Sequence, residues 1–167
     1  MQQHLENVLG AFVFAVSDRI KKALTETTGC SEGASIALAF IGSRTETTID
    51  DLRYSLDVDT HSAATRVVAR LEEQNLITKT KDAKDGRCIQ LHLTPDGERL
   101  RNKMLAERAK ILGKLLDRLD ATEREVIQSA LKKLLAAMSF DLKGCDRTCR
   151  FCDVELCHRG ECPVQPA

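Results

Sequence analysis

Apolar residues recur at helical spacing in the first third of the chain. Over residues 5–24 they form one long stripe, which ends at Thr27–Gly29. Its members are Leu5, Val8, Leu9, Phe12, Val16, Ile20 and Leu24. A shorter, Ala-rich helix is predicted over 31–42. Thr48 is placed to cap a third helix that turns Ile49, Leu52 and Leu56 inward. The first helix has more apolar face than a small domain needs, so we expect it to serve as a dimer arm.

The next helix separates an apolar face from a polar one. Ala64, Val67, Val68 and Leu71 fall at i, i+3, i+4 and i+7, and Asp59 or Thr60 can cap the start. The opposite face carries His61, Ser62, Thr65, Arg66 and Ala69. Short polar side chains with one long cation can approach a nucleic-acid duplex and bond to base edges and phosphates.

A hairpin is predicted immediately after this helix. Residues 76–81 are followed by the charged turn KDAKDGR, and Ile89, Leu91 and Leu93 then alternate with polar residues, as in a half-buried strand. Asp85-Gly86 marks the tip. Helix, tight turn, helix and basic-tipped hairpin together predict a winged helix-turn-helix.

Two further apolar helices are expected after the hairpin. Thr94-Pro95 starts the first, with Thr as cap and Pro at the first position, and Thr122 with Glu125 is predicted to form a capping box for the second. Their stripes need a partner, and the same helices of a second copy would supply one. The predicted fold is therefore mainly α. It divides into an N-terminal dimerisation helix, a winged helix-turn-helix domain, C-terminal dimerisation helices and a cysteine-rich tail, over 1–30, 31–94, 95–141 and 142–167.

Composition narrows the function classes. The 167 residues carry no net charge, 30% are charged and only 4% are aromatic, which suits a mainly helical soluble protein. Any affinity for DNA must therefore come from local placement of cations. The apolar run 8–16 is too short for a membrane span and lacks the positive charge that precedes a signal peptide, so we expect a cytoplasmic protein. No phosphate loop, nucleophile elbow or metalloprotease motif is present, so an enzyme is not expected.

The segment HSAATRVVARLEEQNLI, followed by KDAKDGRCIQLHLTPDGERL, resembles the recognition helix and wing of MarR-type transcriptional regulators. The resemblance covers roughly residues 5–140, and its most specific pieces are Asp85-x-Arg87 and the exit Leu-Thr-Pro-x-Gly at Leu93–Gly97. It implies a homodimer that binds a palindromic operator, and we expect the protein to act as a repressor. The recognition helix would lie in the major groove and Arg87 in the adjacent minor groove. The predicted DNA-contacting residues are His61, Ser62, Thr65, Arg66, Lys84 and Arg87.

The tail concentrates cysteine. From Cys145 it reads CDRTCRFCDVELCHRGECPVQPA, in which Cys149, Cys152, Cys157 and Cys162 have the spacing of a zinc knuckle, although its third ligand is usually His. Such a short segment cannot bury a core, so zinc would supply its folding energy. Clustered cysteines in a cytoplasmic protein indicate metal or redox chemistry rather than structural disulfides.

Alternatives remain open for the tail and for the chain. The cysteines could ligate an iron–sulfur cluster, act as a thiol switch, or belong to a disordered tail with no specific role. Cys30 and Cys88 are expected to be small buried hydrophobes. The competing function is a metal- or redox-responsive dimeric interaction protein that does not bind DNA sequence-specifically. The favoured regulator would respond to a small ligand or to the metal or redox state of its tail.

Overall fold

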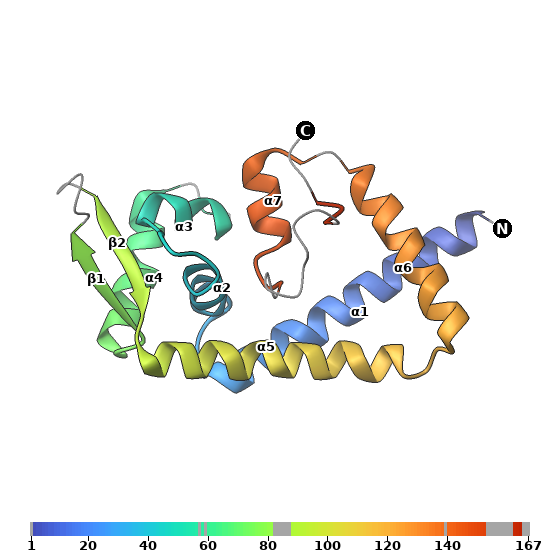
Figure 1. The fold of residues 1–167 in the computed structure, drawn as a ribbon, viewed down its shortest axis with the longest axis horizontal. Helices are drawn as coiled ribbons and strands as arrows, with labels where there is room; N and C mark the ends of the chain where they lie inside the picture. Colours follow the sequence, from blue (N-terminus) through green and yellow to red (C-terminus); the bar gives the residue numbers. More distant parts are fainter. Residues whose placement is uncertain are drawn as a thin grey trace.

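The computed structural model describes residues 2–56, 58, 60–81, 88–138, 140–152 and 162–164. A lobe of short elements lies at one end, and long helices extend away from it (Figure 1). In chain order the elements are α1 (Gln2–Thr28), α2 (Glu32–Ile41), α3 (Ile49–Ser55), α4 (His61–Glu73), β1 (Ile77–Lys81), β2 (Ile89–Leu93), α5 (Pro95–Leu116), α6 (Ala121–Ala136) and α7 (Leu142–Thr148). The predicted fold class, mainly α with a winged helix-turn-helix and long terminal helices, is confirmed.

The core of the lobe forms around α2. Ser31 caps this helix by accepting a hydrogen bond from the Ala34 backbone N–H, and every residue from Ala34 to Ile41 is buried. Phe40 and its neighbours on α2 pack against buried side chains of α3, α4, β1 and β2. These are Leu52, Val68, Leu71, Ile77 and Leu91. The lobe elements are thus held around one shared centre.

Local capping signals fix the helix-turn-helix as predicted. Thr48 begins α3 with a capping box, in which Asp51 accepts a hydrogen bond from the Thr48 backbone N–H. Thr60 caps α4, because its side chain accepts from the Ala63 N–H. On α4 the predicted inner face is confirmed, with Ala64, Val68 and Leu71 fully buried.

The wing is an antiparallel pair whose register runs from Ile77 opposite Leu93 to Lys81 opposite Ile89. The expected alternation is only partly correct. Leu91 is buried, but Ile89 is 37% exposed because it lies at the outer end of the ladder, beyond the core. The predicted tip, with Lys84, Asp85 and Arg87, lies outside the described residues.

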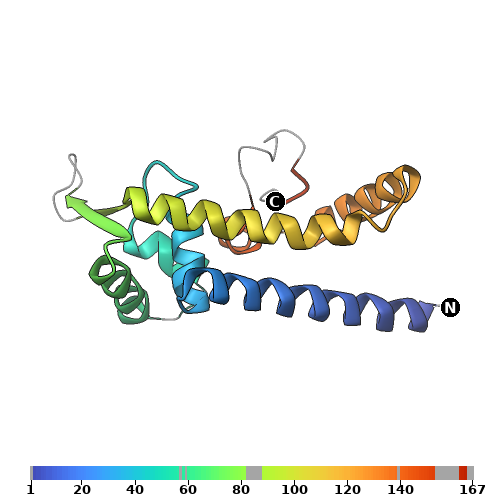
Figure 2. The ribbon, with the colours of Figure 1, turned by 90° about the horizontal axis from the view of Figure 1, so that it is seen from below.

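The long helices begin and end at clear signals, with one correction. Thr94 caps α5 and Pro95 occupies its first turn, as expected. The capping box of α6, however, is Asp120 with Glu123 rather than Thr122 with Glu125. Asp120 lies one residue before the helix and accepts a backbone N–H of its first turn, so Thr122 lies inside the helix. Figure 2 shows α1 and α5 running side by side, and the two helices are in contact.

The tail begins with a helix that the sequence did not predict. Asp141 caps α7 by accepting from the Gly144 N–H at 2.7 Å. The helix packs on α3, and an ion pair between Arg44 and Asp146 joins it to the lobe (Figure 1). Phe151, just beyond α7, packs against Leu24 and Met104 of the long helices. The start of the tail therefore contacts both the lobe and the long helices.

Candidate nucleic-acid interface

The outward face of α4 holds four of the six predicted contact residues. His61, Ser62 and Arg66 are exposed, and Thr65 is half-buried. Thr65 Oγ1 donates to the His61 carbonyl at 2.9 Å, and Arg66 Nε donates to the Ser62 carbonyl at 3.4 Å. These bonds follow the helix axis, so the side chains lie along the helix surface rather than in the core. The structure thus brings these four together on one solvent-facing side.

The first turn of α4 is tied to α3. His61 Nδ1 lies 3.1 Å from a carboxylate oxygen of Asp50, and the same oxygen lies 4.0 Å from Arg53 Nε. A neutral or a protonated imidazole can make the first contact, since either can donate from Nδ1. His61 and Asp50 are both largely exposed, so their contact contributes little to stability. Their effect is to orient the start of the helix.

The wing is attached firmly to the helix-turn-helix. The Leu91 N–H donates to the Thr47 carbonyl at 2.8 Å, and the Thr47 N–H donates to Gln90 Oε1 at 3.0 Å. Lys79 pairs with Glu72 of α4 at 2.5 Å. Because of these bonds, the orientation of the wing strands follows that of α3 and α4. Lys84 and Arg87 fall among the residues that are not described, so their predicted role stays a prediction.

Comparison with known proteins agrees with this geometry. A model described as "MarR family" matches residues 31–87, which span α2 to the wing. The chain contains a MarR-family domain. The chain is 40% identical over 84 residues to the HTH-type transcriptional repressor MdtR of Bacillus subtilis (strain 168), which covers 49% of this chain and 53% of that protein. This chain spans about half the length of the curated relatives it matches.

Solved structures share the fold of this chain, including both the MarR-family domain and the long helices beside it. A MarR family protein from Bacillus stearothermophilus is 22% identical, with a TM-score of 0.71, over 81% of this chain and 94% of that one. A S. aureus MepR mutant bound to oligodeoxyribonucleotide is 18% identical, with a TM-score of 0.59, over 81% and 98%. At these identities the likeness concerns the fold alone. Among the described residues, no helix is both long and apolar enough to cross a bilayer.

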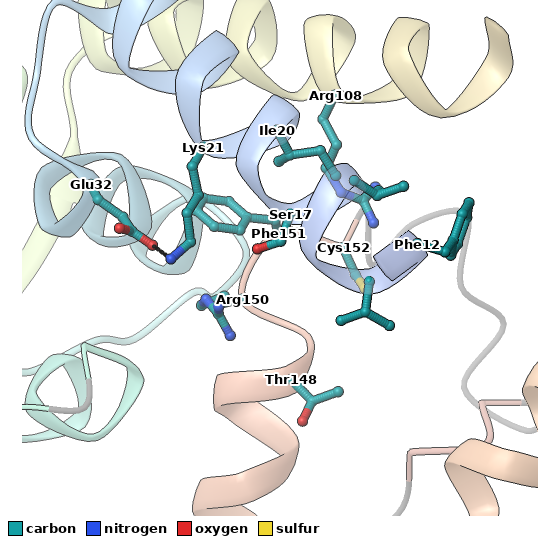
Figure 3. Close-up of a pocket in the computed structure, with 12 residues that line it drawn as sticks. Phe12, Ser17, Ile20, Lys21, Glu32, Arg108, Thr148, Arg150, Phe151 and Cys152 are labelled. Atoms are coloured by element: carbon teal, nitrogen blue, oxygen red, sulfur yellow. Dashed lines mark ion pairs between the residues drawn. The ribbon is translucent and has the colours of Figure 1, made fainter. Parts of the chain in front are cut away.

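The start of the tail lines a cavity of about 340 Å³ together with α1, α5 and Glu32 of α2. Figure 3 shows Phe12 and Ile20 of α1, Arg108 of α5, and Phe151 and Cys152 of the tail around it. The lining is mainly apolar and includes Arg108 and Arg150, together with Lys21, which pairs with Glu32 at 3.2 Å. Such a combination suits a small ligand with an apolar body and a negative end.

Two of the four predicted zinc ligands, Cys149 and Cys152, lie close together, and Cys152 lines this cavity. The Cys152 N–H donates to the Cys149 carbonyl at 2.8 Å in a tight turn, as the two-residue spacing predicts. A hydrogen bond with Cys149 lowers the pKa of the Cys152 thiol to about 6; the charge of Arg108 also lowers it, and burial opposes both.

Cys162 is not brought to that pair, and Cys157 lies outside the described residues. Cys162 lies near Cys145, and its Sγ is 3.5 Å from the Val164 carbonyl oxygen. Burial raises the pKa of the Cys145 thiol, and Asp146 and Asp141 add to the effect. Within the described part of the chain, no three metal-binding side chains converge. The zinc, iron–sulfur and thiol-switch interpretations therefore stay predictions.

Sequence reasoning missed one polar cluster and misplaced one cysteine. Arg53 and Tyr54 of α3 meet Lys143 and Arg147 of α7 around a second cavity. Apart from Arg53 beside the only tyrosine in the chain, no local signal marks the cluster, because it forms only when α7 docks. Cys88 is exposed rather than buried, since it precedes the wing strand β2 at its outer end.

Proposed function

We propose that this protein is a DNA-binding transcriptional regulator that acts as a repressor. The observation that carries the proposal is the two-sided character of α4. Ala64, Val68 and Leu71 anchor one side in the core, while Ser62 and Arg66 stand in solvent on the other. A helix fixed in this way can enter a major groove without disturbing its own packing. Relatives named as repressors and a neighbour bound to an oligonucleotide support the same function.

The regulator would work as a homodimer on a palindromic operator. Among residues 121–136, all of them described, none is buried, although the helix carries Val126, Leu131 and Leu134. On α1, Leu5, Val8 and Phe12 are also largely exposed. Large exposed apolar faces mark association surfaces. Two copies joined through them would present two α4 helices to half-sites about 34 Å apart.

Control of binding would come from the side of the molecule that holds the tail. The cavity beside Arg108 and Phe151 supports a small ligand as one input, because its walls come from α1, α5 and the tail together. The Cys149–Cys152 pair supports a metal or redox input at the same place. Either input would favour one spacing of the two α4 helices over another. The proposal also places Lys84 and Arg87 of the wing in contact with DNA. The expected location of the protein is the cytoplasm.

Selection of bound duplexes from a random DNA pool tests this function. Enrichment of a palindrome with half-sites one helical turn apart is the expected result. Arg87→Ala should then weaken binding to the enriched duplex without altering the circular dichroism spectrum. No enrichment from a folded dimer would instead favour the alternative, an interaction protein that does not read DNA sequence.

Zinc is the metal that we propose for the cysteine tail, with Cys149, Cys152, Cys157 and Cys162 as ligands. Thiolates at these spacings suit a tetrahedral ion. Elemental analysis and a visible absorption spectrum, on protein purified without oxygen, test the proposal. One zinc per chain in a colourless sample is expected, and a brown sample containing iron would assign an iron–sulfur cluster instead.

A further inference from the structure

Cations from two distant parts of the chain surround Tyr54. Arg53 Nη2 donates to the Tyr54 hydroxyl at 2.9 Å, and Lys143 Nζ lies 3.9 Å from the centre of the tyrosine ring. Arg147, one turn after Lys143 on α7, lines the same cavity of about 370 Å³. We call Arg53, Tyr54, Lys143 and Arg147 the Tyr54 cluster.

The described lining of this cavity is rich in cations. Three cations line it, and Asp141 is the only carboxylate among the described residues that do so. One oxygen of Asp141 already accepts the Gly144 N–H as the cap of α7. The hydrogen bond from Arg53 and the charge of Lys143 lower the pKa of the Tyr54 phenol, as a positive local potential requires. A phosphate group has the negative charge and the acceptor oxygens that Arg and Lys side chains bind.

The position of the cavity identifies the source of that phosphate. Val58, in the turn between α3 and α4, also lines it. Arg53 is linked through Asp50 to His61 in the first turn of α4. In helix-turn-helix proteins, the first helix of the motif crosses the DNA backbone while the start of the second contacts base edges. The cavity therefore lies beside the helix end that approaches the duplex.

We propose that the cavity between α3 and α7 binds a backbone phosphate of duplex DNA, with Arg53 supplied by the helix-turn-helix and Lys143 and Arg147 by the tail helix. This inference rests on the proposed function and extends it, because it makes the tail part of the DNA-binding surface. The Arg44–Asp146 ion pair helps to keep α7 docked there. A tail that leaves α3 would remove two cations from the interface.

Salt dependence of DNA binding tests the site. A cation that neutralises one phosphate contributes about 0.9 to the slope of log K against log salt concentration. Lys143→Ala and Arg147→Ala should each reduce the magnitude of the slope by about that amount, on any duplex. Lys103→Ala, on the exposed side of α5, is the matched control and should leave the slope at the parental value. Lys143→Arg should also keep it, because the charge is retained, and this variant separates lost charge from lost docking.

A titration with inorganic phosphate distinguishes a DNA backbone phosphate from a free phosphate ion as the anion bound in the cavity. Tyr54 is the only tyrosine and the chain has no tryptophan, so intrinsic fluorescence reports directly on the cluster. Inorganic phosphate, titrated at constant ionic strength, should change this emission only weakly at millimolar concentration. Saturation by micromolar phosphate, with parental slopes in both alanine variants, would make this a small-anion site and overturn the proposal.

The duplex measurements also separate this inference from the proposed function. If the parent protein enriches a palindrome but both alanine variants keep the parental salt-dependence slope, the phosphate site alone is overturned. A parent that binds no duplex overturns the phosphate site and the regulator function together.

Discussion

The backbone of Gly97 passes against the carbonyl oxygen of Leu76. A Cβ at position 97 would lie far inside van der Waals contact with that oxygen, which also accepts the Thr94 N–H at 3.0 Å. The first turn of α5 is therefore packed on the loop that leads into β1. This contact gives a physical reason for the glycine in the Leu-Thr-Pro-x-Gly exit from the wing.

Gly97→Ala is accordingly expected to destabilise the protein by about 1–3 kcal/mol through overpacking. Gly113 is the matched control on the same helix, because no heavy atom lies within 4 Å of a Cβ placed there. Gly113→Ala should raise the stability by about 0.5–1 kcal/mol, as expected for a position inside a helix where a Cβ meets no neighbour. Chemical denaturation of the two variants measures both free energies, and equal changes would refute the packing argument.

Arg66→Ala should remove sequence-specific DNA binding while leaving the fold intact. The side chain is exposed on α4, and its Nε donates to the Ser62 carbonyl of the same helix. Loss of one good base contact costs about 1–3 kcal/mol of discrimination. Fluorescence anisotropy with the enriched duplex and with a scrambled one measures this difference. Lys103→Ala should keep the parental discrimination, and an Arg66→Ala variant that does so too would remove Arg66 from the interface.

Polar substitutions on α6 should dissociate the dimer. Leu131 and Leu134 are 45% and 52% exposed in the single chain, and burying such side chains is worth about 1.5–3 kcal/mol each. Leu131→Gln combined with Leu134→Gln should raise the dimer dissociation constant by about 100-fold or more, as measured by sedimentation. Ile89→Gln, at an apolar position on the wing that is 37% exposed, is the control. A dimer unaffected by the double change would place the interface elsewhere.

The phenol of Tyr54 should ionise at lower pH than a free tyrosine, whose pKa is about 10. The Arg53 hydrogen bond and the charge of Lys143 favour the phenolate and lower its pKa. Removing one cation makes the phenolate less favourable, so Lys143→Met should move the midpoint upward. Ultraviolet absorption of the single tyrosine measures it without labelling. An unchanged midpoint, matching that of Lys103→Met, would mean that α7 does not dock on α3 in solution.

Much of the fold could be predicted because its signals are local. Thr48, Thr60 and Thr94 each precede an apolar helical period, and each caps the helix that follows. The capping box of α6 was misplaced because Asp120-x-x-Glu123 and Thr122-x-x-Glu125 both satisfy the pattern. The choice depends on where α5 ends, which neither pattern encodes.

The rest depends on contacts between distant segments. A seven-residue helix such as α7 is not stable alone, so its formation follows from packing on α3 and from the Arg44–Asp146 pair. The Tyr54 cluster exists only as a result of that packing. On α4, by contrast, the period of the sequence alone separated the exposed Ser62 and Arg66 from the buried Val68. Periodicity predicted which side of an element faces outward, but not which elements meet.

The continuity of α5 has a mechanical consequence. Its 22 residues run without interruption from the exit of the wing to the turn before α6, a length of roughly 33 Å at 1.5 Å per residue. The helix therefore acts as a lever. By this geometry, a tilt of only about 5° at its far end would displace the wing by about 3 Å, comparable to the length of one hydrogen bond. In the proposed homodimer, a small rearrangement where the two copies meet would suffice to move the wing out of a DNA groove.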